Sequence, residues 1–192
     1  MTAIRISDHP IEPLFLKRWS PRAFDASHMP ETDLLSMLEA ARWAPSAYNI
    51  QPWRFLYSFR DDAHWQTYLS LLDSFNNTWA KSASALIVVV SDSKLPQSEK
   101  KSHYHRFDAG AAWAQLALQA TTQGYYAHAM AGIEFNQTKI KLSIPQQYNV
   151  EIIIAIGRTT HSSQLSEALQ EREVPSQRLP LTEIAFAGIF PK

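Results

Sequence analysis

The feature that most constrains the fold is a run of six apolar residues, ALIVVV, at 85–90. Its length and its content of β-branched residues predict a strand that is buried on both faces. The segment WRFLYSF at 53–59 predicts another strand, and so do residues 125–130 and 150–157, the last of which ends at Gly157. The chain is therefore expected to build a sheet that is covered on both sides.

Helical segments alternate with these strands. A helix is expected at 31–43, an alanine-rich helix at 102–123 that Gly124 ends, and a short helix at 136–144. The first of them starts after Pro30 and has apolar residues at helical spacing, namely Leu34, Leu35, Leu38, Ala41 and Ala44. The alternation indicates a mixed sheet wrapped by helices in one domain over residues 1–192.

The last part of the chain differs from the rest. Residues 162–173 are polar and helix-like, and the segment after them contains two prolines and late apolar residues. This composition predicts an extended arm that packs onto something. An arm of this length on a small domain favours exchange between subunits.

Composition excludes several classes of protein. The chain has 18 basic and 18 acidic residues, which argues against a general electrostatic grip on nucleic acid or on a membrane. It has no cysteine, so disulfides and thiolate chemistry are excluded. The start is polar, and the longest apolar run is too short to cross a bilayer, so a soluble cytoplasmic protein is expected.

The stretch RWSPRAFD at 18–25 carries two arginines and a serine on a stiff piece of backbone. The side chains of Arg18, Ser20 and Arg22 can together offer a fork of donors that matches a phosphate. Because the five glycines form no phosphate-binding pattern, side chains would have to bind such a phosphate. The alternative is a surface loop with two solvated arginines.

A second polar stretch, APSAYNIQPWRF, lies at 44–55. Its two prolines stiffen a loop that presents hydroxyl and amide groups at fixed angles between a helix and a strand. Such a loop can bind the edge of a flat heterocycle that has both donors and acceptors. The alternative is an ordinary polar turn.

Histidines and tryptophans give weaker signals. His103, His105 and Asp108 could supply metal ligands, but the two histidines are two positions apart and lie on different faces of a helix, so no metal is expected. The other histidines are scattered. Four tryptophans are interpreted as core or interface packing, and they are Trp43, Trp53, Trp79 and Trp113.

Together these stretches resemble the nitroreductase family of FMN-dependent oxidoreductases. The resemblance continues in YHRFDAGAAWAQLAL at 104–118, HAMAGIEF at 128–135, SIPQQYNVEIIIAIG at 143–157 and SQRLPLTEIAFAGIF at 176–190. It implies an α+β fold with a mixed, mainly antiparallel central sheet flanked by helices. It also implies a homodimer whose C-terminal arms embrace the partner and whose two FMN molecules lie at the subunit interface.

The resemblance assigns the first group of cofactor-binding residues. Arg18, Trp19 and Ser20 match the family's RxS element, which binds the phosphate and ribityl end of FMN. Arg22 takes the place of a basic residue near the pyrimidine edge of the flavin, where a fixed cation stabilises negative charge. No other residue is assigned a catalytic role, since the flavin is the reactive group.

A second group is implied to reach the cofactor from the partner subunit. Pro45, Ser46, Ala47 and Asn49 resemble the family's loop for that contact, with Gln51 beside it. The loop follows the helix expected at 31–43.

A third group follows the strand expected at 125–130. Met130, Ala131 and Gly132 match a turn that runs along the flavin ring, and Arg178 matches a late arginine that closes on the phosphate. The chain departs from some members of the family at Ser176, where they carry a lysine, so Arg158 is a further candidate for the same anion. Ala131 stands where better-studied members have a glutamate, which leaves the contact with the nicotinamide open.

The function implied is transfer of hydride from NADH or NADPH to FMN and then of electrons to a small nitroaromatic or quinone-like acceptor, in a ping-pong sequence. Three alternatives stay open. One is specialised flavin chemistry, such as reductive dehalogenation or breakdown of reduced FMN. The second is a flavin carrier or sensor, and the third is a domain without a cofactor.

Overall fold

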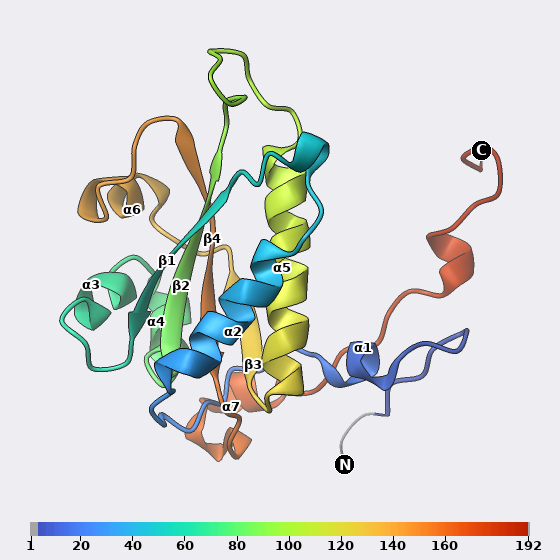
Figure 1. The fold of residues 1–192 in the computed structure, drawn as a ribbon. Coiled ribbons are helices and arrows are strands. Elements are labelled where there is room, and N and C mark those ends of the chain that lie inside the picture. The colour runs from blue at the N-terminus through green and yellow to red at the C-terminus, as the bar shows by residue number, and fades with distance from the viewer. Residues whose placement is uncertain (1–3, 192) are drawn as a thin grey trace.

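The computed structural model describes residues 4–191, so the first three residues of the polar start and the last residue of the expected domain lie outside it. Its centre is a four-stranded sheet in the order β1-β2-β4-β3, in which every neighbouring pair is antiparallel (Figure 1). The strands are β1 (Trp53–Phe59), β2 (Ala85–Asp92), β3 (Tyr126–Met130) and β4 (Tyr148–Gly157). The expected fold class and all four expected strands are confirmed.

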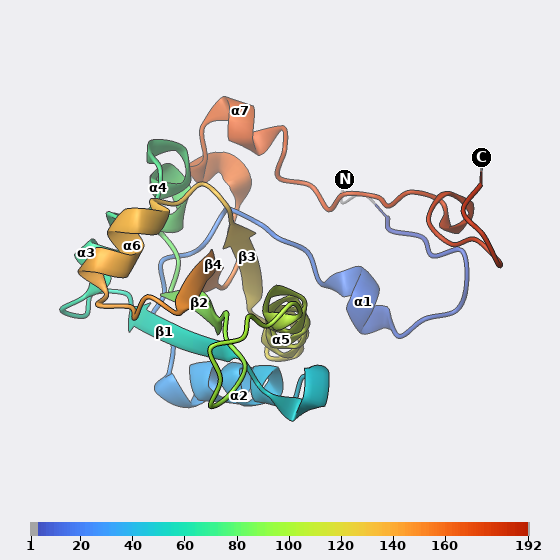
Figure 2. The ribbon, with the colours of Figure 1, turned by 90° about the horizontal axis from the view of Figure 1, so that it is seen from above.

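Helices cover both faces of the sheet (Figure 2). On one face lie α2 (Glu31–Arg42) and α5 (His105–Thr122). On the other face lie α3 (Trp65–Leu69), α4 (Ser74–Ala80) and α6 (Phe135–Lys141). The short helices α3 and α4 were not expected, because helices of five to seven residues make less than two turns and show no clear apolar period.

Strand β2 separates two hydrophobic cores. Leu86, Val88 and Val90 belong to the core on the side of α3 and α4. Ala85, Ile87 and Val89 belong to the core on the side of α2 and α5. Because side chains alternate between the two faces of a strand, the apolar run is buried on both faces, as expected.

The two long helices differ from expectation only in detail. Helix α5 begins at His105 and ends before Gly124, whose φ of 78° is the left-handed conformation of a helix stop. In α2, Leu34 and Ala41 are buried, but Leu35 is 47% exposed and Met37 is buried instead. Residues 34, 37 and 41 share the face of the helix that packs on the sheet, and Leu35 lies outside that face.

Both ends of the chain leave the body together. The N-terminal segment (residues 4–17, including α1 at Pro13–Lys17) and the C-terminal arm (residues 174–191) run side by side away from the sheet (Figures 1 and 2). Gln177 Nε2 donates to the Ile4 carbonyl at 2.8 Å, and the Leu181 amide donates to Asp8 Oδ2 at 2.8 Å. These hydrogen bonds fasten the two ends to each other.

The polar stretch at 162–173 does not form one helix. It contains a 3-10 turn at Ser162–Gln164 and the four-residue α7 at Glu167–Gln170. The arm after it is extended, as expected, apart from a 3-10 turn at Leu181–Glu183.

Candidate functional site

A cavity of about 280 Å³ opens where the stretch at 18–22 meets β3 and the start of the C-terminal arm. We call it the arginine cavity, and its lining residues are Arg5, Arg18, Trp19, Ser20, Arg22, His128, Arg172, Val174, Ser176 and Arg178. Five of these side chains are guanidinium groups. They come from both ends of the chain and from the stretch that follows α1.

The stretch at 18–22 is fixed by its backbone. The amides of Arg22 and Ala23 both donate to Glu173 Oε1, at 2.7 Å and 2.8 Å. The Pro21 carbonyl accepts a hydrogen bond of 2.9 Å from His128 Nδ1. These contacts hold the backbone while the side chains of Arg18, Ser20 and Arg22 face the cavity.

The cavity concentrates positive charge. Burial and then the neighbouring Arg178 lower the pKa of Arg18. Burial and then Arg172 lower the pKa of Arg22. None of its lining residues is a carboxylate. The guanidinium groups therefore repel one another, and an anion placed between them would relieve that repulsion.

An orphaned polar atom points to the same conclusion. In the described part of the chain, Arg22 Nε is buried and has no hydrogen-bond partner. A buried donor without an acceptor is costly, and a ligand that supplies an acceptor removes the cost. Arg22 also lies over the ring of Trp79, with its guanidinium carbon 5.9 Å from the ring centroid.

A second cavity, of about 430 Å³, adjoins the arginine cavity. Both are lined by Arg18, Ser20 and His128. Its other walls are mostly apolar and come from α1, α5 and β3, namely Phe15, Trp113, Ala114, Ala117, Leu118 and Ala129. The two cavities together offer a cationic end and an apolar end, which fits a phosphate that carries a flat, largely apolar ring system.

His128 is a site residue that the sequence did not reveal, since nothing in its spacing sets it apart. Its ring lies 4.7 Å from the ring of Trp79, between centroids. Burial lowers its pKa to about 4, so the ring is neutral near pH 7. His128 therefore brings no further positive charge to either cavity.

Arg5 and Arg172 were also missed. Arg5 Nε donates to the Ser176 carbonyl at 3.0 Å, and its Nη1 donates to the carbonyls of Leu16 and Arg18 at 3.1 Å and 2.5 Å. Its guanidinium group thus ties the N-terminal segment to the C-terminal arm. A single arginine near a chain end carries no sequence signal for such a role.

Arg158 is not part of this site. Its guanidinium group stacks on Tyr125, with 4.2 Å from the guanidinium carbon to the ring centroid. It is absent from the lining of the arginine cavity. The expectation that Arg158 compensates for Ser176 is therefore not supported, and Arg5 and Arg172 supply that charge instead.

The expected loop at 45–51 lies away from both cavities of its own chain. The Ala47 amide donates to Asp108 Oδ2, at 3.2 Å, in the first turn of α5. The second cavity touches the same helix farther along, from Trp113 to Leu118. Within one chain, the residues Pro45, Ser46, Ala47, Asn49 and Gln51 line neither cavity.

Backbone strain marks this loop. Tyr48, Asn49 and Gln51 have φ values of 51°, 55° and 52°, in the left-handed region that non-glycine residues rarely adopt. The Gln51 amide donates to Ser46 Oγ at 3.0 Å, which helps to hold the conformation. Clustered strain of this kind is typical of functional loops.

The turn at 130–132 begins beside the second cavity, since Ala129 lines it. Met130 is buried and Ala131 is exposed. A Cβ atom on Gly132 would lie 1.9 Å from Asp73 Oδ2, so this position requires glycine. The Gly132 carbonyl accepts from the Asp73 amide at 3.0 Å.

The histidines considered as metal ligands are separated. His105 and Asp108 are buried, but Asp108 binds the loop at Ala47, and His103 is exposed. Among residues 4–191, no group of three potential ligands surrounds a common point.

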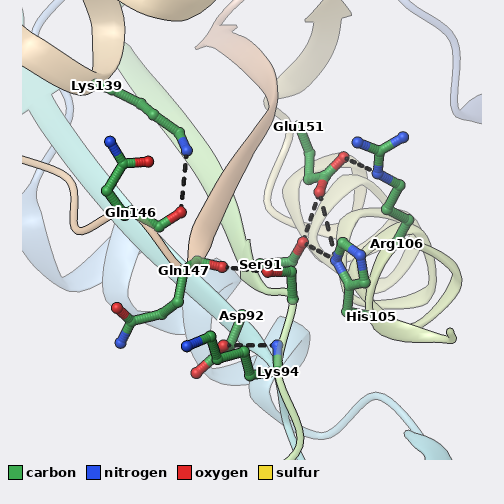
Figure 3. Close-up of polar contacts among 10 residues, drawn as sticks. Ser91, Asp92, Lys94, His105, Arg106, Lys139, Gln146, Gln147 and Glu151 are labelled. Atoms are coloured by element: carbon green, nitrogen blue, oxygen red, sulfur yellow. Dashed lines mark hydrogen bonds and ion pairs between the residues drawn. The ribbon is translucent and has the colours of Figure 1, made fainter. Parts of the chain in front are cut away.

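His105 belongs to a different polar cluster (Figure 3). Ser91 Oγ donates to Glu151 Oε1 at 2.5 Å, so His105 Nδ1 donates to Ser91 Oγ at 2.6 Å. Arg106 Nε lies 3.5 Å from Glu151 Oε2. Glu151 sits where the register between β2 and β4 shifts, and the cluster satisfies its carboxylate.

The four tryptophans interpreted as packing residues differ in their surroundings. Trp53 and Trp79 are buried, as expected for packing residues. Trp43 is 71% exposed, and Arg42 stacks on its ring, so it is not part of the core of this chain. Trp113 lines the second cavity.

Comparison with known proteins identifies the class. The model of the nitroreductase family matches residues 16–69. A solved oxidoreductase containing FMN has 50% sequence identity and a TM-score of 0.95, over 97% of this chain and 96% of that one. The oxygen-insensitive NADPH nitroreductase of Helicobacter pylori strain J99 is 33% identical over 149 residues, 76% of this chain and 64% of that protein.

A more distant solved structure agrees in fold. The putative nitroreductase of Desulfovibrio desulfuricans, solved in complex with FMN, has a TM-score of 0.74 at 24% identity and covers 96% of this chain and 100% of that one. Both solved structures thus share with this chain an α+β fold, in which helices flank a central sheet. The chain belongs to the nitroreductase family of FMN-dependent NAD(P)H oxidoreductases. In the described residues, no helix is long and apolar enough to span a bilayer.

Proposed function

We propose that this chain is a single FMN-binding domain that transfers hydride from NADH or NADPH to a small nitroaromatic or quinone-like acceptor, with the two substrates using the site in turn. The observation that carries the proposal is the junction of the arginine cavity with the second cavity at Arg18, Ser20 and His128. FMN has the same two parts, a phosphate and a flat ring system. Relatives named as NADPH nitroreductases support the choice of electron donor.

The phosphate end is assigned to the arginine cavity. Arg18 and Ser20 bind it from the body of the protein, with Trp19 beside them, and Arg178 binds it from the C-terminal arm. Arg5 and Arg172 add charge from the two ends of the chain. Guanidinium groups suit this role, because they pair with phosphate oxygens through two parallel hydrogen bonds.

Arg22 lines the arginine cavity only, and it is assigned to the pyrimidine edge of the ring where this cavity adjoins the second one. Bound FMN supplies the ring that accepts and donates hydride. Arg22 places a fixed cation beside it, and the buried Nε is a donor already stripped of water. The apolar walls of the second cavity orient the ring and exclude water, so no protein nucleophile is required.

The remaining residues act at the edges of the ring. The turn formed by Met130, Ala131 and Gly132 follows Ala129, which lines the second cavity, and its backbone amides are assigned to the ring. The loop that holds Pro45, Ser46, Ala47, Asn49 and Gln51 reaches the ring in the partner subunit. Its separation from its own chain's cavities supports that assignment.

Exposed apolar surface on the C-terminal arm supports a homodimer. The C-terminal arm carries exposed apolar side chains, among them Ile184, Ile189 and Phe190. Together with the N-terminal segment it lines a further cavity of about 350 Å³ with mainly apolar walls. Exposed apolar surface of this extent on an extended arm favours burial against a second subunit.

The first test is the visible absorption spectrum of the purified protein, reconstituted with FMN and then treated with NADPH or NADH without oxygen. Flavin bands that bleach support the oxidoreductase. Bands that persist with both donors support a flavin carrier or sensor instead. A protein that fails to take up FMN overturns the proposal.

The acceptor needs a second experiment. Initial rates are measured while the concentrations of NADPH and of a nitroaromatic or quinone are both varied. Parallel double-reciprocal lines support the ping-pong sequence, and intersecting lines contradict it. Halogenated aromatics in the same assay, and products of FMN breakdown, test for specialised flavin chemistry.

A further inference from the structure

His128 links the backbone of the stretch at 18–22 to the wall of both cavities. Its Nδ1 lies 2.9 Å from the Pro21 carbonyl oxygen. Because a carbonyl only accepts, Nδ1 carries the proton and donates it. Pro21 lies between Ser20 and Arg22, so this hydrogen bond fixes the backbone that carries both side chains.

The ring of His128 also contacts the aromatic platform beneath Arg22. The centroids of the rings of His128 and Trp79 lie 4.7 Å apart, and the guanidinium carbon of Arg22 lies 5.9 Å from the centroid of the same Trp79 ring. Trp79 is fully buried and packs on Phe24, so the platform is part of the hydrophobic core. Arg22 and His128 are thus held to one ring as well as to one stretch of backbone.

The protonation state suits this role. The pKa of His128 is about 4, lowered by burial and, more weakly, by the charge of Arg22. A neutral ring avoids repulsion with Arg18, Arg22, Arg172 and Arg178, which line the same cavity. The residue can therefore lie among arginines and still keep its donor on Nδ1.

We infer that His128 is a positioning residue, which sets the place of the Arg22 guanidinium relative to the ring of bound FMN through its hydrogen bond to the Pro21 carbonyl. The inference rests on the proposed function, because it takes FMN as the ligand of the two cavities. It goes beyond that function because it assigns to His128 an effect on the midpoint potential of the flavin that is exerted through Arg22.

Two substitutions separate the two contacts of His128. His128→Phe keeps a ring against Trp79 but removes the hydrogen bond to Pro21. His128→Asn keeps a donor close to the position of Nδ1 and removes the ring. The matched control is His103→Leu, because His103 is exposed and lines neither cavity.

The measurements are the dissociation constant of FMN and the midpoint potential of the bound flavin. Loss of the part-buried hydrogen bond to Pro21 in His128→Phe should raise the dissociation constant about tenfold. It should also lower the potential in the direction of the Arg22→Ala variant, because a displaced cation stabilises negative charge less. His128→Asn and His103→Leu should keep both quantities near their wild-type values.

A double-mutant cycle shows whether His128 acts through Arg22. In the Arg22→Ala background, adding His128→Phe should leave the potential unchanged, because the cation is already gone. An equal shift in both backgrounds would mean that His128 acts on the flavin directly and would overturn the inference. So would a wild-type potential in His128→Phe itself.

The remaining outcomes are also decisive. If His128→Phe fails to fold, His128→Asn decides: a wild-type potential supports the inference, and a potential as low as that of Arg22→Ala overturns it. A wild-type protein that takes up no FMN overturns the proposed function together with this inference. Wild-type protein with normal FMN uptake and an unaffected His128→Phe variant overturns this inference alone.

Discussion

Glu173 accepts a hydrogen bond from the backbone amide of Arg22 at 2.7 Å, and the same oxygen accepts another from Ala23 at 2.8 Å. One carboxylate near the start of the C-terminal arm thus satisfies two successive amides in the stretch that lines both cavities. The position of this stretch depends on a residue about 150 positions away in the sequence.

Removal of this carboxylate should destabilise the fold. Glu173→Ala leaves both amides without their acceptor, and we expect it to lower the free energy of unfolding by about 1–3 kcal/mol in urea titrations. The control is Glu171→Ala, at an exposed position two residues earlier, which should change it by less than about 0.5 kcal/mol. Equal effects of the two variants would contradict this account.

Gly132→Ala tests the tight turn after β3. The new Cβ would meet Asp73 Oδ2 at 1.9 Å and Asn76 Nδ2 at 2.6 Å, so we expect a loss of about 1–3 kcal/mol in the free energy of unfolding. Gly110→Ala is the matched control, because a Cβ atom at that position would have no neighbouring atom within 4 Å. In the interior of α5 it should raise stability by about 0.5–1 kcal/mol.

Arg18→Ala tests the phosphate assignment. Loss of charge-assisted hydrogen bonds should weaken FMN binding about 10- to 100-fold in titrations monitored by flavin fluorescence. Riboflavin, which lacks the phosphate, should lose much less affinity. The control is Arg158→Ala, which should bind FMN like the wild type because Arg158 lies outside the cavity. A comparable loss for riboflavin would place Arg18 at the ring instead.

Stability should depend on pH through His128. Its pKa is lowered from 6.5 to about 4 in the folded protein, so between these values the unfolded chain binds a proton that the folded chain does not. The free energy of unfolding should therefore fall as the pH drops from about 6.5 to about 4, by on the order of 3 kcal/mol from this residue.

The measurement is urea unfolding without added FMN at about pH 7.5 and about pH 4.5, in the wild type and in His128→Asn. The variant should lose distinctly less stability than the wild type. An identical loss in both proteins would mean that other groups carry the acid sensitivity.

Two substitutions in the C-terminal arm test the homodimer. Ile189 and Phe190 are each 81% exposed in the single chain, so Ile189→Asp with Phe190→Asp should leave its fold intact while weakening association. Sedimentation should then detect monomers at concentrations where the wild type is dimeric. Ile140→Asp, on exposed α6, is the control and should not change the association.

Strong local patterns made most of the fold predictable. The apolar run in β2 and the alanine-rich α5 are long enough to identify their own secondary structure. Helices α3 and α4 were missed because their five and seven residues are fixed mainly by packing against the sheet. Tertiary contacts decided these elements, and one sequence does not display such contacts.

The candidate site was predictable only where its residues are close in sequence. Arg18, Ser20 and Arg22 form a recognisable stretch, and the structure places all three in the arginine cavity. Arg5 and His128 reach the same cavity from distant parts of the chain. Arg158 was misjudged for the same reason, since stacking on Tyr125 turns it elsewhere.

Residues from both ends of the chain line the arginine cavity. Arg5 enters it from the N-terminal segment and Arg178 from the C-terminal arm, and Arg5 joins the two through the Ser176 carbonyl. Trimming either end takes a guanidinium group from the cavity and releases the other end from its fastening. Cleavage by a protease or fusion of an affinity tag at one terminus would therefore change the arginine cavity, although most of its residues lie far away in the sequence. The affinity of the cavity for an anion would then show whether both termini are intact.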